Sequence, residues 1–232
     1  LRAYLTDIYS RLPIYDLTQA NLDTNTDIAT TNKGNQTALT TGSMSRSSEP
    51  GVISFWNYAI IRDLNVFLEN IEEAPIGESI KAQLEGEART LRALIYFEKQ
   101  KRYGGVPLVD VALDPFNEID IQYRKRNTEE SLADFIDSEL TIAVGLLTEE
   151  SEPKGQINKW TANALKARAN LWSASIAKYG DVQLDGLVGI PAARANEFFE
   201  KASAAADAVI SSGKYSLYNQ LPDKAENYRR LF

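Results

Sequence analysis

The side chains that could support catalysis are limited by two absences, because the chain contains no histidine and no cysteine. A Ser-His-Asp triad, a thiolate nucleophile, a disulfide and a Cys/His metal site are therefore excluded. Paired carboxylates remain, at Glu72-Glu73, Glu129-Glu130 and Glu149-Glu150. Glycoside hydrolysis needs two acids about 5–10 Å apart that flank one bond, whereas adjacent residues of a helix point in different directions. We interpret these pairs as solvated acids near helix ends, and we predict no catalytic residue, no metal and no cofactor.

Polar side chains that could bind a ligand gather in residues 19–51, a stretch rich in Asn, Thr, Ser and Gly. A structureless loop of about thirty residues is rare in a compact domain and is usually functional or disordered. Convergent donors and acceptors in a concave site can bind sugar hydroxyls. The candidates are Asp27, Asn32, Asn35 and Arg46. The alternative is that these residues only form side-chain turns within a polar loop.

A sugar site usually also contains an aromatic platform, because the apolar face of a sugar packs on a flat ring. The loop 19–51 contains no Phe, Tyr or Trp. Trp56 and Trp172 belong to apolar helical stripes, so we expect both in the core. Trp160 follows Lys159 at the start of a predicted helix and could be exposed.

The elements that must position these residues are helices, because apolar residues recur at steps of three and four. The stripes lie at residues 1–12, 53–71, 84–95, 132–147, 165–176 and 198–209. Strand signals are short, at 106–111 and 215–218, so the predicted class is all-α. Alanine-rich stretches in the last two helices favour close, stacked helix pairs of tetratricopeptide type, although no clean 34-residue repeat is present. The two long loops are 19–51 and 104–126.

Boundary residues agree with this assignment. Asn127, with Glu130 three residues later, predicts an N-cap, and Pro191 is placed where a first-turn proline is tolerated. Gly104, Gly180 and Gly213 each follow an apolar stripe and are typical of C-terminal stops. The pairs Glu85-Arg89, Glu98-Arg102 and Glu197-Lys201 have the spacing of surface ion pairs.

The charge balance restricts the partners. Twenty-five basic and 32 acidic residues give a net charge of -7, and the basic run at 124–126 is too short for a nucleic-acid surface. We therefore predict no nucleic acid, favour neutral partners such as sugars or peptides, and expect the basic run to screen nearby acids or form salt bridges. No apolar run approaches the ~20 residues of a membrane span.

Several segments together resemble the SusD/RagB-like family of outer-membrane lipoproteins. Trp56, Tyr58, Ile61 and Asn65 are similar to its W-x-x-x-Y-x-x-I-x-x-x-N helix, with Tyr58 two residues after the Trp instead of four. The more specific match is to E-A-x-x-L-R-A-x-x-Y-F followed by Y-G-G-V-P-L-V, at residues 87–97 and 103–109. Further matches follow in order, at 124–147, 164–175 and 206–217, so the resemblance covers nearly the whole chain.

The resemblance implies an amino-terminal part, residues 1–232, of a SusD-like domain whose carboxyl-terminal half is absent. It implies a non-enzymatic, surface-exposed lipoprotein that delivers starch-like or other oligosaccharides to a SusC-like TonB-dependent transporter in the outer membrane. Membrane contact would be only through a lipid anchor outside this chain. It also makes Asp27 the nearest match to an acidic ligand-binding residue. A peptide-binding member and a general helical-repeat interaction scaffold are the alternatives, and a carboxylate-based hydrolase is less favoured than either.

Arg92 stands beside the apolar stripe of Leu91 and Ile95. In the family pattern we expect a buried or half-buried guanidinium that pairs with a carboxylate, such as Glu87 or one from a neighbouring helix. The expected role is therefore in the scaffold and not in ligand binding.

Overall fold

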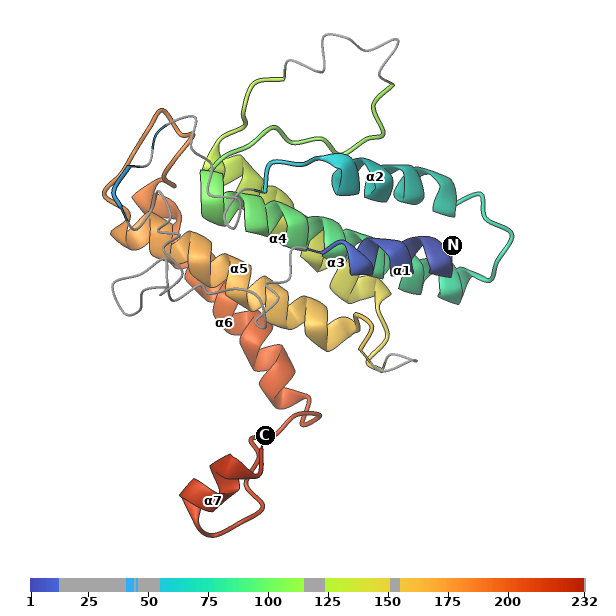
Figure 1. The fold of residues 1–232 in the computed structure, drawn as a ribbon, viewed down its shortest axis with the longest axis vertical. Coiled ribbons are helices and arrows are strands. Elements are labelled where there is room, and N and C mark those ends of the chain that lie inside the picture. The colour runs from blue at the N-terminus through green and yellow to red at the C-terminus, as the bar shows by residue number, and fades with distance from the viewer. Residues whose placement is uncertain (13–40, 44, 46–54, 115–123, 151–154, 232) are drawn as a thin grey trace.

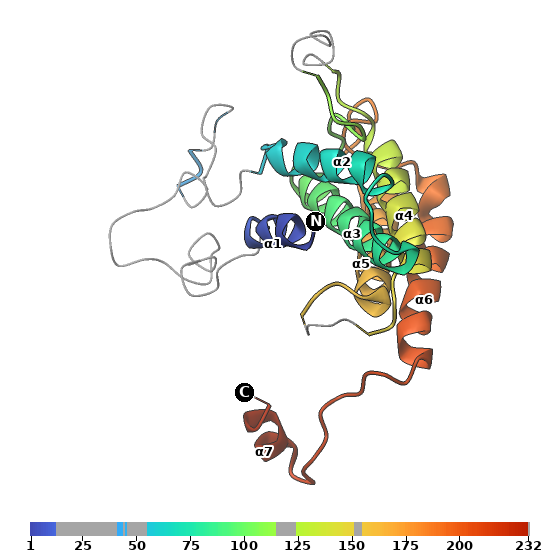
Figure 2. The same ribbon diagram turned by 90° about the vertical axis from the view of Figure 1, so that its right-hand side faces the viewer.

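The computed structural model describes residues 1–12, 41–43, 45, 55–114, 124–150 and 155–231. Its helices are α1 (Arg2–Ser10), α2 (Ala59–Ile71), α3 (Glu78–Tyr103), α4 (Glu129–Leu146), α5 (Lys159–Tyr179), the 3-10 helix η3 (Ala192–Arg194), α6 (Ala195–Ser211) and α7 (Lys224–Arg229). Helices that follow one another in the chain pack side by side from α2 to α6 (Figures 1 and 2). The predicted all-α class of stacked helices is confirmed.

The short α7 lies beyond the end of α6 and apart from the other helices (Figures 1 and 2). Within the described ranges there is no strand, only an isolated bridge between Leu184 and Val188. The two segments with strand signals, 106–111 and 215–218, are therefore irregular.

The core forms around α3, whose 26 residues pack between α2 and α4. The apolar stripes predicted from the sequence supply this core, since Leu64, Leu91, Ile95, Leu132 and Leu140 are all fully buried. A smaller cluster, centred on Phe198 and Ala174, joins α5 and α6. Burial of each large apolar side chain contributes about 1.5–3 kcal/mol, so the stability of the larger cluster comes mainly from the packing of α2 and α4 against α3.

Both ends of α1 are fixed to α3 through the buried carboxylate of Glu87. Arg2 donates to it at 2.7 Å, and the Tyr9 hydroxyl donates to it at 3.1 Å. The Tyr9 oxygen also accepts from the Ile157 amide at 3.1 Å. Glu87 therefore ties together three segments that are distant in the sequence.

The end of α3 depends on two adjacent glycines. Gly104 has φ 69°, which only glycine adopts without strain. A Cβ at Gly105 would lie 2.0 Å from the carbonyl oxygen of Asn127, so this position has no room for any side chain. The predicted stop at Gly104 is confirmed, and it allows the chain to turn directly against residues 127–129.

Three predicted boundaries need correction or refinement. The N-cap of α4 is Thr128 and not Asn127, because the Asn127 side chain accepts the Leu108 amide at 2.9 Å instead. Pro191 precedes η3 and does not lie in its first turn. Gly180 ends α5 as predicted, but its φ of -74° does not require glycine.

The three predicted ion pairs are present, with Glu85-Arg89 at 2.7 Å, Glu98-Arg102 at 2.5 Å and Glu197-Lys201 at 2.9 Å. The Glu98-Arg102 pair is not at the surface as predicted, because its side chains are only 11% and 7% exposed. Each contributes only a few tenths of a kcal/mol where it is exposed.

Candidate functional site

The candidate site is built on residues 106–113, an irregular segment whose backbone bonds to side chains and not to a neighbouring strand. The Tyr96 hydroxyl donates to the Val109 carbonyl at 3.0 Å and accepts from the Val109 amide at 2.8 Å. Asn65 Nδ2 donates to the carbonyls of Val109 and Val111, at 2.9 and 2.8 Å. Side chains of α2 and α3 thus satisfy backbone groups that a sheet would otherwise satisfy.

The Arg92 guanidinium holds both Asn65 and the segment 106–113 in place. Its Nη1 donates to Asn65 Oδ1 at 2.8 Å and to the Asp110 carbonyl at 3.1 Å. Its Nε and Nη2 face Glu139 Oε2 of α4 at 2.8 and 2.7 Å, and both side chains are only 5% exposed. The predicted buried guanidinium paired to a neighbouring helix is confirmed. Of the two partners considered, Glu139 is the one used, because Glu87 is engaged with α1.

The basic run at 124–126 also bonds to backbone. Arg124 Nη1 donates to the Leu108 carbonyl at 2.8 Å, and Arg126 Nε donates to the Gly105 carbonyl at 2.7 Å. Within the described ranges neither guanidinium lies within ion-pair distance of a carboxylate. The expectation of charge screening or salt bridges stays a prediction for these two arginines. Arg124 holds the second side of the segment 106–113, and Arg126 holds the turn that precedes it.

A buried lysine holds the other wall of the site, residues 55–58. Lys99 is fully buried in α3, and its Nζ donates to the carbonyls of Phe55 and Asn57 at 2.7 and 3.0 Å. The same Nζ lies 4.9 Å from the ring centroid of Phe55 and 4.3 Å from that of Tyr58. Burial, together with the nearby charge of Arg102, lowers the pKa of Lys99 to about 7.

These contacts explain where α2 begins. The carbonyls of Phe55 and Asn57 accept hydrogen bonds from Lys99. The Asn57 side chain accepts a hydrogen bond from the Ala59 amide at 2.7 Å. The helix therefore starts at Ala59, and Trp56 lies before it. The apolar stripe that begins at Ile53 predicts a helix that is too long at its start. Periodicity is local and does not register the contacts of Lys99, which lies about forty residues away. Ile53 itself lies outside the described residues.

The placement of the tryptophans was the largest error of the sequence interpretation. Trp56 is 43% exposed and Trp172 is 38% exposed, so neither belongs to the core. Trp160, whose position was left open, is only 8% exposed. The Trp56 ring is held edge-on by Tyr103 and Tyr58, at centroid distances of 5.1 and 6.0 Å. It is therefore an oriented surface ring.

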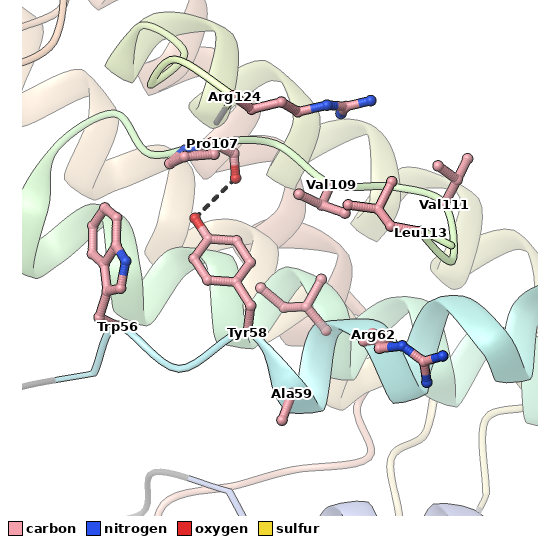
Figure 3. Close-up of a pocket in the computed structure, with 10 residues that line it drawn as sticks. Trp56, Tyr58, Ala59, Arg62, Pro107, Val109, Val111, Leu113 and Arg124 are labelled. Carbon is pink, nitrogen blue, oxygen red and sulfur yellow. Dashed lines mark hydrogen bonds between the residues drawn. The ribbon is translucent and has the colours of Figure 1, made fainter. Parts of the chain in front are cut away.

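The two walls enclose a cavity of about 460 Å³, within the range of roughly 300–1,000 Å³ of small-molecule sites. Figure 3 shows the Tyr58 hydroxyl bridging the walls by donating to the Pro107 carbonyl, at 2.9 Å. The lining residues are Trp56, Tyr58, Ala59, Ile61, Arg62, Pro107, Val109, Val111, Leu113 and Arg124. Apolar and aromatic surface dominates, with two guanidinium groups as the charged components.

This composition suits binding. None of the described lining residues is acidic, so the cavity presents no carboxylate pair of the kind that glycoside hydrolysis needs. In the described part of the chain no cluster of three or more potential metal ligands was found. The arrangement can pack an apolar ring face on Trp56 and hold polar groups through Arg62 and Arg124.

All four ligand-binding residues predicted from the sequence, Asp27, Asn32, Asn35 and Arg46, lie outside the described residues. Seven of the ten described lining residues belong to motifs singled out in the sequence, at 56–65 and 103–109. The signal that could have revealed them is the alternation of Pro107, Val109 and Val111, which places every second side chain on one face.

The carboxylate pairs behave in two ways. Glu72, Glu73, Glu149 and Glu150 are exposed as expected. Glu129 is only 3% exposed, and it accepts the Gly189 amide at 2.8 Å. Burial raises its pKa. The solvated interpretation was thus wrong for Glu129, which fixes the turn at residues 184–189 onto the start of α4.

A second hollow lies between α5 and α6, on a different part of the fold. It encloses about 780 Å³ and is lined mainly by small apolar residues, among them Ala164, Ala167, Ala202 and Ala206. Leu171 and Ile210 also line it and are 51% and 74% exposed. We call this hollow the α5–α6 groove.

No helix in the described ranges combines the length and the apolar character that crossing a bilayer requires.

Comparisons with known proteins agree with the motif analysis. A family model named SusD-like, described as starch-binding and associating with the outer membrane, matches residues 4–171. A curated SusD-like protein of Bacteroides ovatus is 30% identical over 117 residues, which are 49% of this chain and 21% of the relative.

Solved structures show the same likeness. A SusD-like protein of Bacteroides fragilis has 30% identity and a TM-score of 0.58, covering 75% of this chain and 29% of that one. A laminarin-binding SusD-like protein has 21% identity and a TM-score of 0.60, covering 83% and 37%, and at that identity it indicates the fold alone. The chain therefore spans between a fifth and two fifths of the length of these relatives.

Proposed function

Because this chain belongs to the SusD-like family, we propose that it binds glycans, without cleaving them, in the cavity beside Trp56. The observation that carries the proposal is the exposed Trp56 ring, fixed by Tyr58 and Tyr103 at the edge of a cavity that contains charged and aromatic groups. An oriented ring is the surface on which the apolar face of a sugar packs.

The buried network supports this proposal. Ring orientation depends on Lys99, and the opposite wall depends on Tyr96, Asn65 and Arg92. A site whose walls are fixed before the ligand arrives loses less conformational entropy on binding. Several buried polar side chains therefore fix the shape of this cavity.

The wider role is also a proposal. We propose that residues 1–232 are the amino-terminal part of a longer SusD-like domain, and that the protein is a lipid-anchored component of the outer-membrane surface. In that setting it would deliver oligosaccharides to a SusC-like TonB-dependent transporter. The description of the matching family, starch-binding and associating with the outer membrane, supports this setting.

The test is retardation of the purified full-length protein in native gels that contain soluble polysaccharides, with intact glycan recovered afterwards. Trp56→Ala should abolish retardation. Trp172→Ala is the matched control, because it removes an equally exposed tryptophan from α5. Equal loss with both variants, release of sugar products, or binding of peptides alone would contradict the proposal, and the last result would favour a peptide-binding member.

A further inference from the structure

We propose that the cavity beside Trp56 selects acidic glycans, with Arg62 and Arg124 binding a carboxylate or sulfate while Trp56 packs against the sugar ring. This inference rests on the proposed function and goes beyond it by assigning the ligand's charge. Three features support it: the charge of the lining, the absence of carboxylates among the described lining residues, and the direction of the two side chains.

The lining is cationic although the whole chain is acidic. The chain carries a net charge of -7, yet the ten lining residues that the structure describes include two arginines and no acid. Most other arginines of the described ranges pair with carboxylates, as Arg11 does with Asp63 and Arg102 with Glu98, at 2.8 and 2.5 Å. A cationic cavity in an acidic protein attracts an anion locally without making the whole surface attract anions.

Two neighbouring acids of α2 are engaged elsewhere. Asp63, the next residue after Arg62, pairs with Arg11, and Glu69 accepts the Ala112 amide at 2.6 Å. Arg62 is exposed and forms no ion pair with any residue that the structure describes. Arg124 uses Nη1 to hold the Leu108 carbonyl, and a guanidinium has four further N–H donors. Both groups therefore have donors available for a ligand.

The geometry suits a ring with an anionic substituent. Figure 3 shows Arg62 on α2 and Arg124 on the opposite edge, both extending toward the Val111 and Leu113 end of the cavity, away from Trp56. A ligand whose ring lies at the aromatic end can place an anion against either arginine. The planar guanidinium fork matches carboxylate and sulfate oxygens in paired hydrogen bonds.

The experiment compares glycans that share a backbone and differ in charge. Binding of the full-length protein is measured by calorimetry with polygalacturonate and its fully methyl-esterified form, and with sulfated and desulfated galactan. We expect at least one acidic form to bind roughly tenfold or more tightly than its neutral counterpart, which is the effect of one or two charge-assisted hydrogen bonds. That preference should weaken as salt rises.

The variants locate the effect. Arg62→Gln should lower the ratio of the affinity for the acidic form to that for the neutral form about tenfold. Arg168→Gln is the matched control, because it removes an exposed arginine of α5 at the α5–α6 groove. Thermal melting of both variants should match the parent, since neither guanidinium has an ion pair among the described residues.

The outcomes separate this inference from the proposed function. If neutral glycans bind equally well or more tightly, with Trp56→Ala abolishing binding and Arg62→Gln having no effect, glycan binding stands and acidic selectivity is overturned. If no glycan of either kind binds, both are overturned. If only an aspartate-rich peptide binds through Arg62, the anionic site is of a different ligand class and the glycan assignment is overturned.

Discussion

The cavity beside Trp56 and the α5–α6 groove are both hollows at the surface, but they are constructed differently. The groove is shaped by two regular helices that approach through alanines such as Ala167 and Ala202. The cavity is lined by the start of α2 and by non-helical segments, which buried polar groups hold in place, chiefly Lys99, Tyr96 and Arg92. The groove thus offers mainly apolar contact, whereas the cavity has hydrogen-bonding groups at fixed positions. Single polar substitutions should therefore damage the cavity far more than the groove.

The largest expected effect follows from removing Arg92. Arg92→Met should lower the free energy of unfolding by about 3–5 kcal/mol, because it leaves the Glu139 carboxylate buried without one of its cations. Urea denaturation measures this loss, and the ratio of affinities among glycans should not change. Arg92→Met combined with Glu139→Leu should recover much of the stability. An unchanged unfolding midpoint with lost binding would contradict the scaffold role.

A smaller effect should appear in the pH dependence of stability. The folded-state pKa of Lys99 is about 7, below the ordinary value of 10.5, so between these values the unfolded chain binds more protons. Stability should therefore rise with pH, by about 2 kcal/mol between pH 7 and pH 9, and fall as pH decreases through 7. Urea titrations of the parent and Lys99→Met at both pH values measure the difference. Parallel pH profiles for the two proteins would show that Lys99 does not titrate in this range.

The ion-pair network at the α4–α6 contact should matter less. Arg194 faces Glu130, Asp134 and Glu197 at 2.6, 2.7 and 2.8 Å, but these groups are largely solvated. Arg194→Gln should cost about 1 kcal/mol at most at neutral pH. Arg194, followed by Lys201, lowers the pKa of Glu197 to about 2. The small contribution of Glu197 is present above pH 4.5 and is lost as pH falls toward 2, where parent and variant should converge in thermal melting.

The smallest effect is expected in the α5–α6 groove. Leu171→Ser replaces a half-exposed side chain and should change stability by no more than about 0.5 kcal/mol. Glycan affinity in native gels should match the parent. A loss of glycan binding with this variant would mean that the groove, and not the cavity, is the ligand site.

The sequence predicted the helices well and the site poorly, for one physical reason. Helical periodicity is local, so the buried stripes of α2 to α6 could be recognised from spacing, and so could the glycine stop at Gly104. The site depends on contacts between distant residues, such as Lys99 with the Phe55 carbonyl. Trp56 has the spacing of a core residue and leaves the helix only because Lys99 holds the chain there. Asn127 has the chemistry of an N-cap and loses that role to a contact with Leu108.

In the segment 106–113, backbone atoms hold the segment in place, whereas side chains line the proposed ligand cavity. Its anchors bind backbone atoms, with the carbonyls of Pro107, Leu108 and Val109 accepting from Tyr58, Arg124 and Tyr96. The side chains at 107, 109, 111 and 113 line the cavity. Every residue type has the same backbone carbonyl group. These hydrogen bonds therefore do not depend on which side chains stand at the non-proline positions. Val109, Val111 and Leu113 can therefore be randomised to change which ligand the cavity binds. The backbone hydrogen bonds that hold the segment would remain in place.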